Sequence, residues 1–232
     1  MFEAKIKKLI IKIVHYCFPQ SLYKKVSYSQ DGEDMMIQTY YETKKKYKGF
    51  YVDVGAHHPY RFSNTAYFYK KGWRGINIEP SPALYCSFQK RRRRDINLNI
   101  GVSSNKASIP FYIFNDQALN TFDEKLAQER DSNNDRYEII SKVEIQTYPL
   151  RDILEKHLPD NQSIDFLTID AEGLDLEVLL SNDWIKFQPE FILVECDMDL
   201  ENVNQGKIYK FLKEKNYNIT GKTKRTCLFR RN

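Results

Sequence analysis

The sequence lacks the cysteine spacings and the long apolar segments that define several classes of protein. Its 232 residues contain only four cysteines, Cys17, Cys86, Cys196 and Cys227, and no CxxC pair, so it has no zinc signature. Scattered thiols of this kind are typical of reduced, cytoplasmic proteins. The sequence also shows no apolar run long enough to span a bilayer and no signal segment with a small-residue cleavage site. We therefore expect a cytoplasmic protein, either free or associated with a membrane surface.

The composition indicates a globular protein of modest charge. Hydrophobic residues make up 41% of the chain and aromatic residues 14%, which excludes a disordered chain. The net charge is +5, and the excess of basic residues lies in short patches, one of them at residues 90–94. No aromatic residues interleave with that run, so we interpret it as the solvated end of a helix and expect no nucleic-acid partner.

The chain is predicted to consist of an N-terminal helix within residues 1–26 and a globular domain over residues 27–232. The pattern over residues 2–18 predicts an amphipathic basic helix. Its apolar side carries Phe2, Ile6, Leu9, Ile10, Ile13, Val14 and Cys17, whereas Lys5, Lys8, Lys12 and His15 lie elsewhere on the helix. Two interpretations stay open. Either the helix lies on an anionic membrane surface, or it packs on the domain or on a second subunit of a homo-oligomer.

Residues 50–54 predict the first core strand, because an apolar run here ends in Gly55 and a loop that contains Pro59. Asp53 lies inside this run, and a carboxylate in an apolar strand is costly unless it is paired or binds something. Gly55 would let the backbone approach a ligand closely at the carboxyl end of the strand, where open α/β sheets bind ligands. The alternative is a structural Asp with a satisfied side chain and a turn Gly.

A second strand, predicted over residues 75–79, also ends in an acid. Asp53 and Glu79 are separated by a spacing that fits one βαβ unit of roughly 30 residues. A carboxylate that closes the second strand can accept hydrogen bonds from both ribose hydroxyls of a nucleotide. Together the two acids suggest a cofactor that contains adenosine.

Two later strands, predicted over residues 164–170 and 191–195, end in Asp170 and Glu195. In a parallel sheet all four acids would meet at one edge, where they would repel one another unless they bind donors or a cation. S-adenosylmethionine offers ribose hydroxyls, an ammonium group and a sulfonium cation, whereas the pyrophosphate of NAD is anionic. The loop after Asp53 also lacks the full GxGxxG pattern. A divalent ion held by Asp170, Glu195 and Asp197 is a further alternative, although no ligand spacing specifies one.

Five motifs, taken together, resemble the FkbM family of S-adenosylmethionine-dependent O-methyltransferases. They lie in the family's order and spacing at residues 29–34, 53–59, 63–65, 72–80 and 164–173, so that the resemblance covers about residues 27–200. It implies an α/β fold of the Rossmann-like class I methyltransferase type, with a mostly parallel seven-stranded sheet and a C-terminal antiparallel hairpin. It also implies methylation of a hydroxyl on a sugar, a glycan or a glycosylated small molecule. Residues 115–142 lie outside the clear match and are predicted to be an insertion or lid that selects this acceptor.

The resemblance also implies roles for individual residues. Gly55 and Ala56 would face the methionine part of S-adenosylmethionine, Asp53 would anchor their loop, and Glu79 would hold the ribose. Val102 or Ser103 would lie near the adenine, and Gln30 and Asp31 would close over the cofactor.

The candidates for the general base, which would take the proton of the acceptor hydroxyl, are Asp170, His57 and His58. A packing role for either histidine is equally open. Two other functions also remain as alternatives to methyl transfer. One is a nicotinamide-dependent dehydrogenase or epimerase, and the other is a cofactor-binding module without catalysis.

Overall fold

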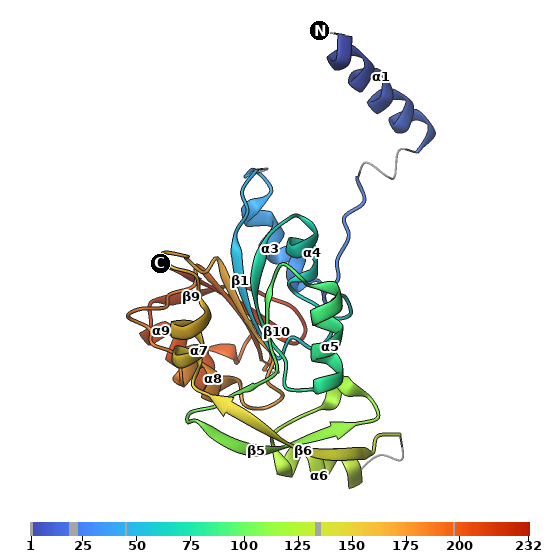
Figure 1. The fold of residues 1–232 in the computed structure, drawn as a ribbon. Helices are drawn as coiled ribbons and strands as arrows, with labels where there is room; N and C mark the ends of the chain where they lie inside the picture. Colours follow the sequence, from blue (N-terminus) through green and yellow to red (C-terminus); the bar gives the residue numbers. More distant parts are fainter. Residues whose placement is uncertain (1, 19–22, 45, 133–135, 197) are drawn as a thin grey trace.

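The structure is a computed structural model that describes residues 2–18, 23–44, 46–132, 136–196 and 198–232. Its centre is a seven-stranded sheet in the order β3-β2-β1-β7-β8-β10-β9 (Figure 1). The strands are β1 (Phe50–Val54), β2 (Arg74–Ile78), β3 (Ile96–Leu98), β7 (Phe166–Ile169), β8 (Phe191–Glu195), β9 (Tyr217–Lys222) and β10 (Thr226–Arg231). The first five are mutually parallel, and β10 runs antiparallel to both of its neighbours. This arrangement confirms the predicted class I methyltransferase sheet with its C-terminal antiparallel hairpin.

The central strand β1 explains why its sequence is almost continuously apolar. It pairs with β2 on one side and β7 on the other, and all five of its residues are buried. Side chains alternate between the two faces of a sheet, so Val52 and Val54 enter one hydrophobic cluster and Tyr51 enters the other. The same alternation places Asp53 on the face that carries Tyr51, where it needs polar partners.

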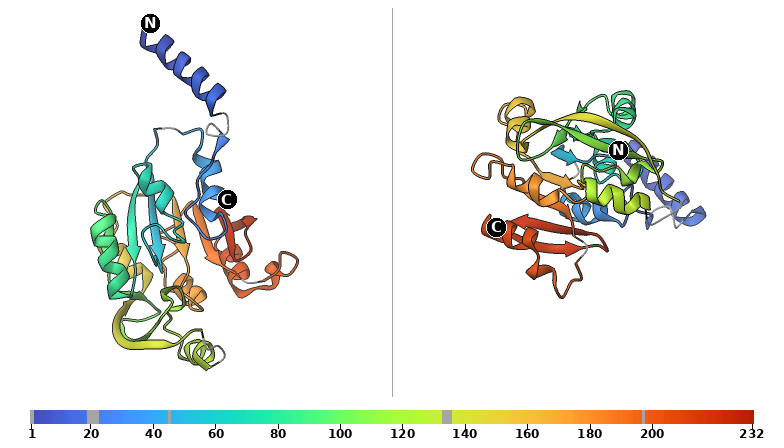
Figure 2. Two further views of the ribbon diagram at one scale, coloured as in Figure 1. Left: turned by 90° about the vertical axis from the view of Figure 1, so that its right-hand side faces the viewer. Right: turned by 90° about the horizontal axis from the view of Figure 1, so that it is seen from below.

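Helices cover both faces of the sheet (Figures 1 and 2). Buried side chains of α7 (Leu150–His157), α8 (Asp175–Leu180) and α9 (Lys207–Glu214) form one cluster with the sheet. The other face packs against α3 (Glu33–Tyr41) and α4 (Ala66–Lys70), in a cluster rich in aromatic rings. The helix α5 (Pro82–Arg91) contacts β3, and the short helix η2 (Val203–Gln205) precedes α9. The result is the three-layer arrangement expected of a parallel α/β sheet.

A second, three-stranded sheet lies next to the carboxyl ends of the main strands (Figure 1). It consists of β4 (Gly101–Val102), β6 (Ile139–Tyr148) and β5 (Ala107–Phe114), and the chain between β5 and β6 forms η1 (Gln117–Leu119) and α6 (Glu124–Ser132). The apolar run over residues 96–103 is therefore divided between the two sheets, as β3 and β4. The chain leaves the main sheet after Leu98 and pairs with β6 instead, because Gly101 and Val102 lie in register with Thr147 and Tyr148.

The helix α1 (Phe2–Cys17) lies away from both sheets and their covering helices (Figure 1 and the left view of Figure 2). None of its described side chains belongs to a hydrophobic cluster of the domain. Within the described residues, no helix has the length and apolar character needed to cross a membrane.

Candidate functional site

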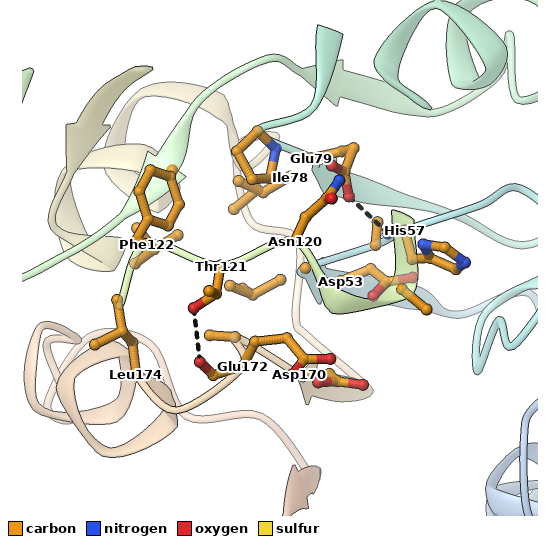
Figure 3. Close-up of a pocket in the computed structure, with 18 of the residues that line it drawn as sticks. Asp53, His57, Ile78, Glu79, Asn120, Thr121, Phe122, Asp170, Glu172 and Leu174 are labelled. Carbon is orange, nitrogen blue, oxygen red and sulfur yellow. Dashed lines mark hydrogen bonds between the residues drawn. The ribbon is translucent and has the colours of Figure 1, made fainter. Parts of the chain in front are cut away.

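A cavity opens at the carboxyl ends of β1, β2 and β7, and it holds about 960 Å³ of empty space when its open mouth is included. Asp53, Glu79 and Asp170 all line it, so the structure brings together three of the four predicted strand-end acids (Figure 3). Gly55, Ala56 and Val102 line the same cavity, as predicted for the cofactor site, and so does Gln30.

Gly55 allows the loop after β1 to pass directly over the end of β7. Its φ of +74° lies in the left-handed region, and a Cβ at this position would lie 1.8 Å from the carbonyl oxygen of Asp170. The backbone N–H groups of Gly55 and Ala56 both donate to the carbonyl oxygen of Ile78 at the end of β2. Only glycine fits this position, and the contact sets the close spacing of the three strand ends.

Glu79 is a buried carboxylate that is held by backbone groups. Its two side-chain oxygens accept hydrogen bonds from the N–H groups of His57 and Ser81, each at 2.7 Å. Burial raises the pKa of Glu79 to about 8, although these two hydrogen bonds act in the opposite direction. A carboxylate has about four acceptor positions. Glu79 can therefore accept further hydrogen bonds from a ligand in the cavity.

Asp53 is held by a side-chain hydrogen bond that begins a longer network. Its Oδ2 accepts from the hydroxyl of Thr65 at 2.8 Å, which supplies the partner that a carboxylate inside a strand requires. Burial raises the pKa of Asp53 to about 6, while the bond from Thr65 and the charge of Arg92 lower it. The Thr65 hydroxyl in turn accepts from Nη2 of Arg92 at 3.0 Å, so the orientation of Asp53 depends on Arg92.

Arg92 corrects the interpretation of residues 90–94 as a solvated helix end, because its side chain is fully buried. Its five donor hydrogens are directed to five acceptors. They are the Pro59 and Thr65 carbonyl oxygens and the Tyr51, Ser63 and Thr65 hydroxyls. The carboxylate of Asp95 balances its charge at 3.8 Å. Neighbouring Arg91, Arg93 and Arg94 are exposed, as predicted. Sequence reasoning missed Arg92 because its partners lie far from it along the chain.

Asp170 is surrounded by other acids. Its side chain opens into the cavity, and desolvation followed by the charge of Glu195 contributes most to holding its pKa well above the ordinary value. Glu172, Asp175 and Asp53 add to the same effect. Among the described residues that line the cavity there is no lysine or arginine. The cavity therefore favours a ligand that brings positive charge or hydrogen-bond donors, and it disfavours a pyrophosphate.

The two adjacent histidines have different positions. His57 lines the cavity, and its Nε2 is buried without a hydrogen-bond partner among the described residues. Burial lowers the pKa of His57 to about 4, so the imidazole is neutral at pH 7. Nδ1 of His58 instead accepts the N–H groups of Tyr60 and Arg61 at 3.1 and 3.0 Å, which stabilises the turn outside the cavity lining. The proposed role of each histidine as a base stays a prediction.

Several predicted residues lie outside the cavity lining. Asp31 pairs with Arg225, with 3.3 Å between Oδ2 and Nη1. The Ser103 hydroxyl donates to the Asn105 carbonyl oxygen at 2.7 Å. Glu195 lines a separate hollow beside α9, although its charge raises the pKa of Asp170. Asp197 lies outside the described residues, within which no group of three or more His, Cys, Asp or Glu side chains is placed to hold a metal ion.

Residues 117–122, which belong to the predicted insertion, form a wall of the cavity and were not predicted individually. Asn120 is buried, and its Oδ1 accepts the Phe114 N–H at 2.8 Å, while its Nδ2 has no partner among the described residues. The Thr121 hydroxyl donates to the carbonyl oxygen of Glu172 at 3.0 Å, across the cavity (Figure 3). Asn64 and Thr168 also line the cavity, and Nδ2 of Asn64 donates to the Thr168 hydroxyl at 2.9 Å.

Comparison with known protein families gives one match, to the Methyltransferase FkbM domain over residues 53–219. This region contains the strand-end acids and Arg92, and it extends into β9. No curated protein matches the chain.

Among solved structures, this chain is similar to methyltransferase FkbM from Methylobacillus flagellatus KT, with 15% identity and a TM-score of 0.47, over 79% of this chain and 43% of that one. It is also similar to a putative O-methyltransferase from Klebsiella pneumoniae, with 10% identity and a TM-score of 0.45, over 90% and 82% of the two chains. The chain thus spans less than half the length of the Methylobacillus protein. Family membership rests on the domain match and not on these structural likenesses.

Replacement of Arg92 by lysine should lower the free energy of unfolding by about 2–4 kcal/mol, because an ammonium group cannot serve the five buried acceptors that the guanidinium reaches. Urea denaturation measures this loss. The matched control is Arg93→Lys at an exposed position, which should change stability by less than about 0.5 kcal/mol. Equal stability of the two variants would show that the Arg92 network does not hold the site together.

The stability of the ligand-free protein should fall as the pH rises toward 8. The folded-state pKa of Glu79, about 8, lies above its ordinary 4.5, so between these values the folded protein retains a proton that the unfolded chain has lost. Each such group lowers stability by at most about 1.4 kcal/mol per pH unit in this window. Glu79→Gln should reduce the slope, because it removes this raised pKa. Urea midpoints measured across this range test the prediction, with the exposed Glu129→Gln as control.

Proposed function

Because residues 53–219 match the family's domain, the chain belongs to the FkbM methyltransferase family, and from this premise we propose that it transfers a methyl group from S-adenosylmethionine to a hydroxyl oxygen. The observation that carries the proposal is the cavity itself. Asp53, Glu79 and Asp170 converge on it, and no lysine or arginine is among its described lining residues. A sulfonium nucleoside with an ammonium group complements such a cavity, whereas a nicotinamide dinucleotide places its pyrophosphate among carboxylates.

The residues present fit this cofactor. Glu79 keeps free acceptor positions for ribose hydroxyls, and the backbone of Gly55 lines the cavity beside it. The buried Nδ2 of Asn120 offers a donor to an acceptor atom of the bound molecule. The bound cofactor would supply the methyl group on a good leaving group, so that the protein mainly has to bind, orient and exclude water.

Two side chains in the cavity can take the proton of the acceptor hydroxyl. The raised pKa of Asp170 makes its carboxylate a stronger base than an ordinary aspartate. His57 is neutral, and its unpartnered Nε2 can accept a proton, although its lowered pKa makes it a weak base. We favour Asp170 because it lies at the end of β7, beside Gly55, and lines the same cavity as Asn120 and Thr121.

We propose a sugar or glycan hydroxyl as the acceptor. The wall contributed by the insertion carries amide and hydroxyl groups, including Gln117, Asn120 and Thr121, which suit a ligand rich in hydroxyls. The ring of Phe122 belongs to the same wall and offers an apolar surface. We place the reaction in the cytoplasm, in keeping with four cysteines that are all free.

Isothermal titration calorimetry should detect binding of S-adenosylmethionine and no binding of NAD⁺ at the same concentrations. Asn120→Ala should weaken the binding of S-adenosylmethionine by about ten-fold, the loss expected for one hydrogen bond from a buried donor. The control Asn115→Ala removes an amide from the same segment but outside this cavity, and should leave affinity unchanged. Absence of binding heat with S-adenosylmethionine would contradict the assignment of the cofactor. Equal affinity of the two variants would contradict the role of Asn120 as a hydrogen-bond donor to it.

Mass spectrometry of glycans incubated with the protein and S-adenosylmethionine should reveal an acceptor that gains the mass of one methylene group. With that acceptor and saturating S-adenosylmethionine, Asp170→Asn should lower turnover by about 100-fold or more if Asp170 is the base. His57→Ala tests the second candidate in the same assay. Unchanged turnover in both variants would remove both residues from proton transfer.

A further inference from the structure

The apolar side of α1 has no covering partner within the described parts of the chain. Leu9 is 59% exposed, Ile13 53% and Tyr16 90%, which are high values for large apolar side chains. The helix lies apart from the domain (Figure 1 and the left view of Figure 2). Both faces of the main sheet are already covered, by α3 and α4 on one side and by α7, α8 and α9 on the other. The domain therefore does not need α1 to complete its core.

The charge on α1 indicates what covers this surface. Lys5, Lys7, Lys8 and Lys12 lie on the same helix, whose single acid is Glu3, and Lys24 follows it. A second copy of the helix would bury the apolar residues but would bring like charges together, at a cost in stability. Nucleic acid would neutralise the charge of the lysines but would leave the isoleucine side chains exposed to water. An anionic lipid surface satisfies both, because headgroups neutralise lysines while acyl chains accept the apolar side.

We propose that α1 binds anionic membrane surfaces, with its axis in the plane of the interface and Leu9, Ile10 and Ile13 inserted among the lipids. The domain would then be tethered to the bilayer through α1. The proposal does not depend on methyl transfer, since none of the described residues of α1 lines the cavity.

Vesicle flotation of the full chain tests this proposal. The protein should float with vesicles of phosphatidylcholine containing phosphatidylglycerol, and much less with phosphatidylcholine alone. Leu9→Glu/Ile13→Glu should reduce partitioning at least about ten-fold, because it places carboxylates in the inserted surface. Lys5→Gln/Lys12→Gln should weaken binding only to the anionic vesicles and reduce its dependence on salt.

Two matched controls separate this effect from general changes of charge or hydrophobicity. Ile185→Glu removes an apolar side chain that is 93% exposed on the domain, and Lys90→Gln/Lys125→Gln removes two exposed charges there. Both should float like the unchanged protein, and all variants should keep the same urea midpoint. The proposal fails if the Leu9/Ile13 variant floats normally or if the unchanged protein does not float. It also fails if light scattering shows that the unchanged protein is a dimer, that the Leu9/Ile13 variant is a monomer, and that neither binds vesicles. A second copy of the chain would then cover the helix.

Discussion

The structure depends on keeping three carboxylates close together at one edge of a buried sheet. Their mutual repulsion and their loss of hydration both oppose folding, and the raised pKa values of Asp53, Glu79 and Asp170 express this cost. The compensating bonds come mainly from the protein backbone and from neutral hydroxyls. Two N–H groups hold Glu79, and a threonine hydroxyl holds Asp53. No cation of the protein enters the cavity lining within the described residues, so these carboxyl groups have no countercharge there until a ligand supplies one.

The buried Arg92 shows how the fold stabilises such a site without neutralising it. Its guanidinium lies one hydroxyl away from Asp53, since Thr65 stands between them. The charge therefore lowers the pKa of Asp53 from a distance, while Asp95 remains the nearer counter-ion. The same side chain binds the carbonyl oxygen of Pro59 and the hydroxyl of Ser63, which holds the loop after β1 in place. One residue thus positions both the loop and the carboxylate without touching the cavity.

Much of the main sheet and of the site at its edge could be predicted from the sequence, because both depend on patterns of neighbouring residues. Apolar runs that end in acids located β1, β7 and β8, and Gly55 marked the close backbone approach after β1. What depends on contacts between distant segments could not be read in this way. The run at residues 90–94 contains one buried and three exposed arginines, and nothing in their order separates them. The departure of the chain from the main sheet after Leu98 depends likewise on pairing with β6, more than 40 residues away.

The bonds between the insertion and the loop after β7 have a mechanical consequence. The Thr121 hydroxyl donates to the carbonyl oxygen of Glu172, and Nη2 of Arg130 donates to the Glu172 side chain at 2.6 Å. Two residues of the insertion therefore bind Glu172. Glu172 and Gly173 both have positive φ, which leaves this loop little freedom to adjust by itself. Any outward swing of the insertion must therefore break both attachments or pull the neighbour of Asp170 along with it. Displacement of the insertion is in this way coupled to displacement of the loop that follows Asp170.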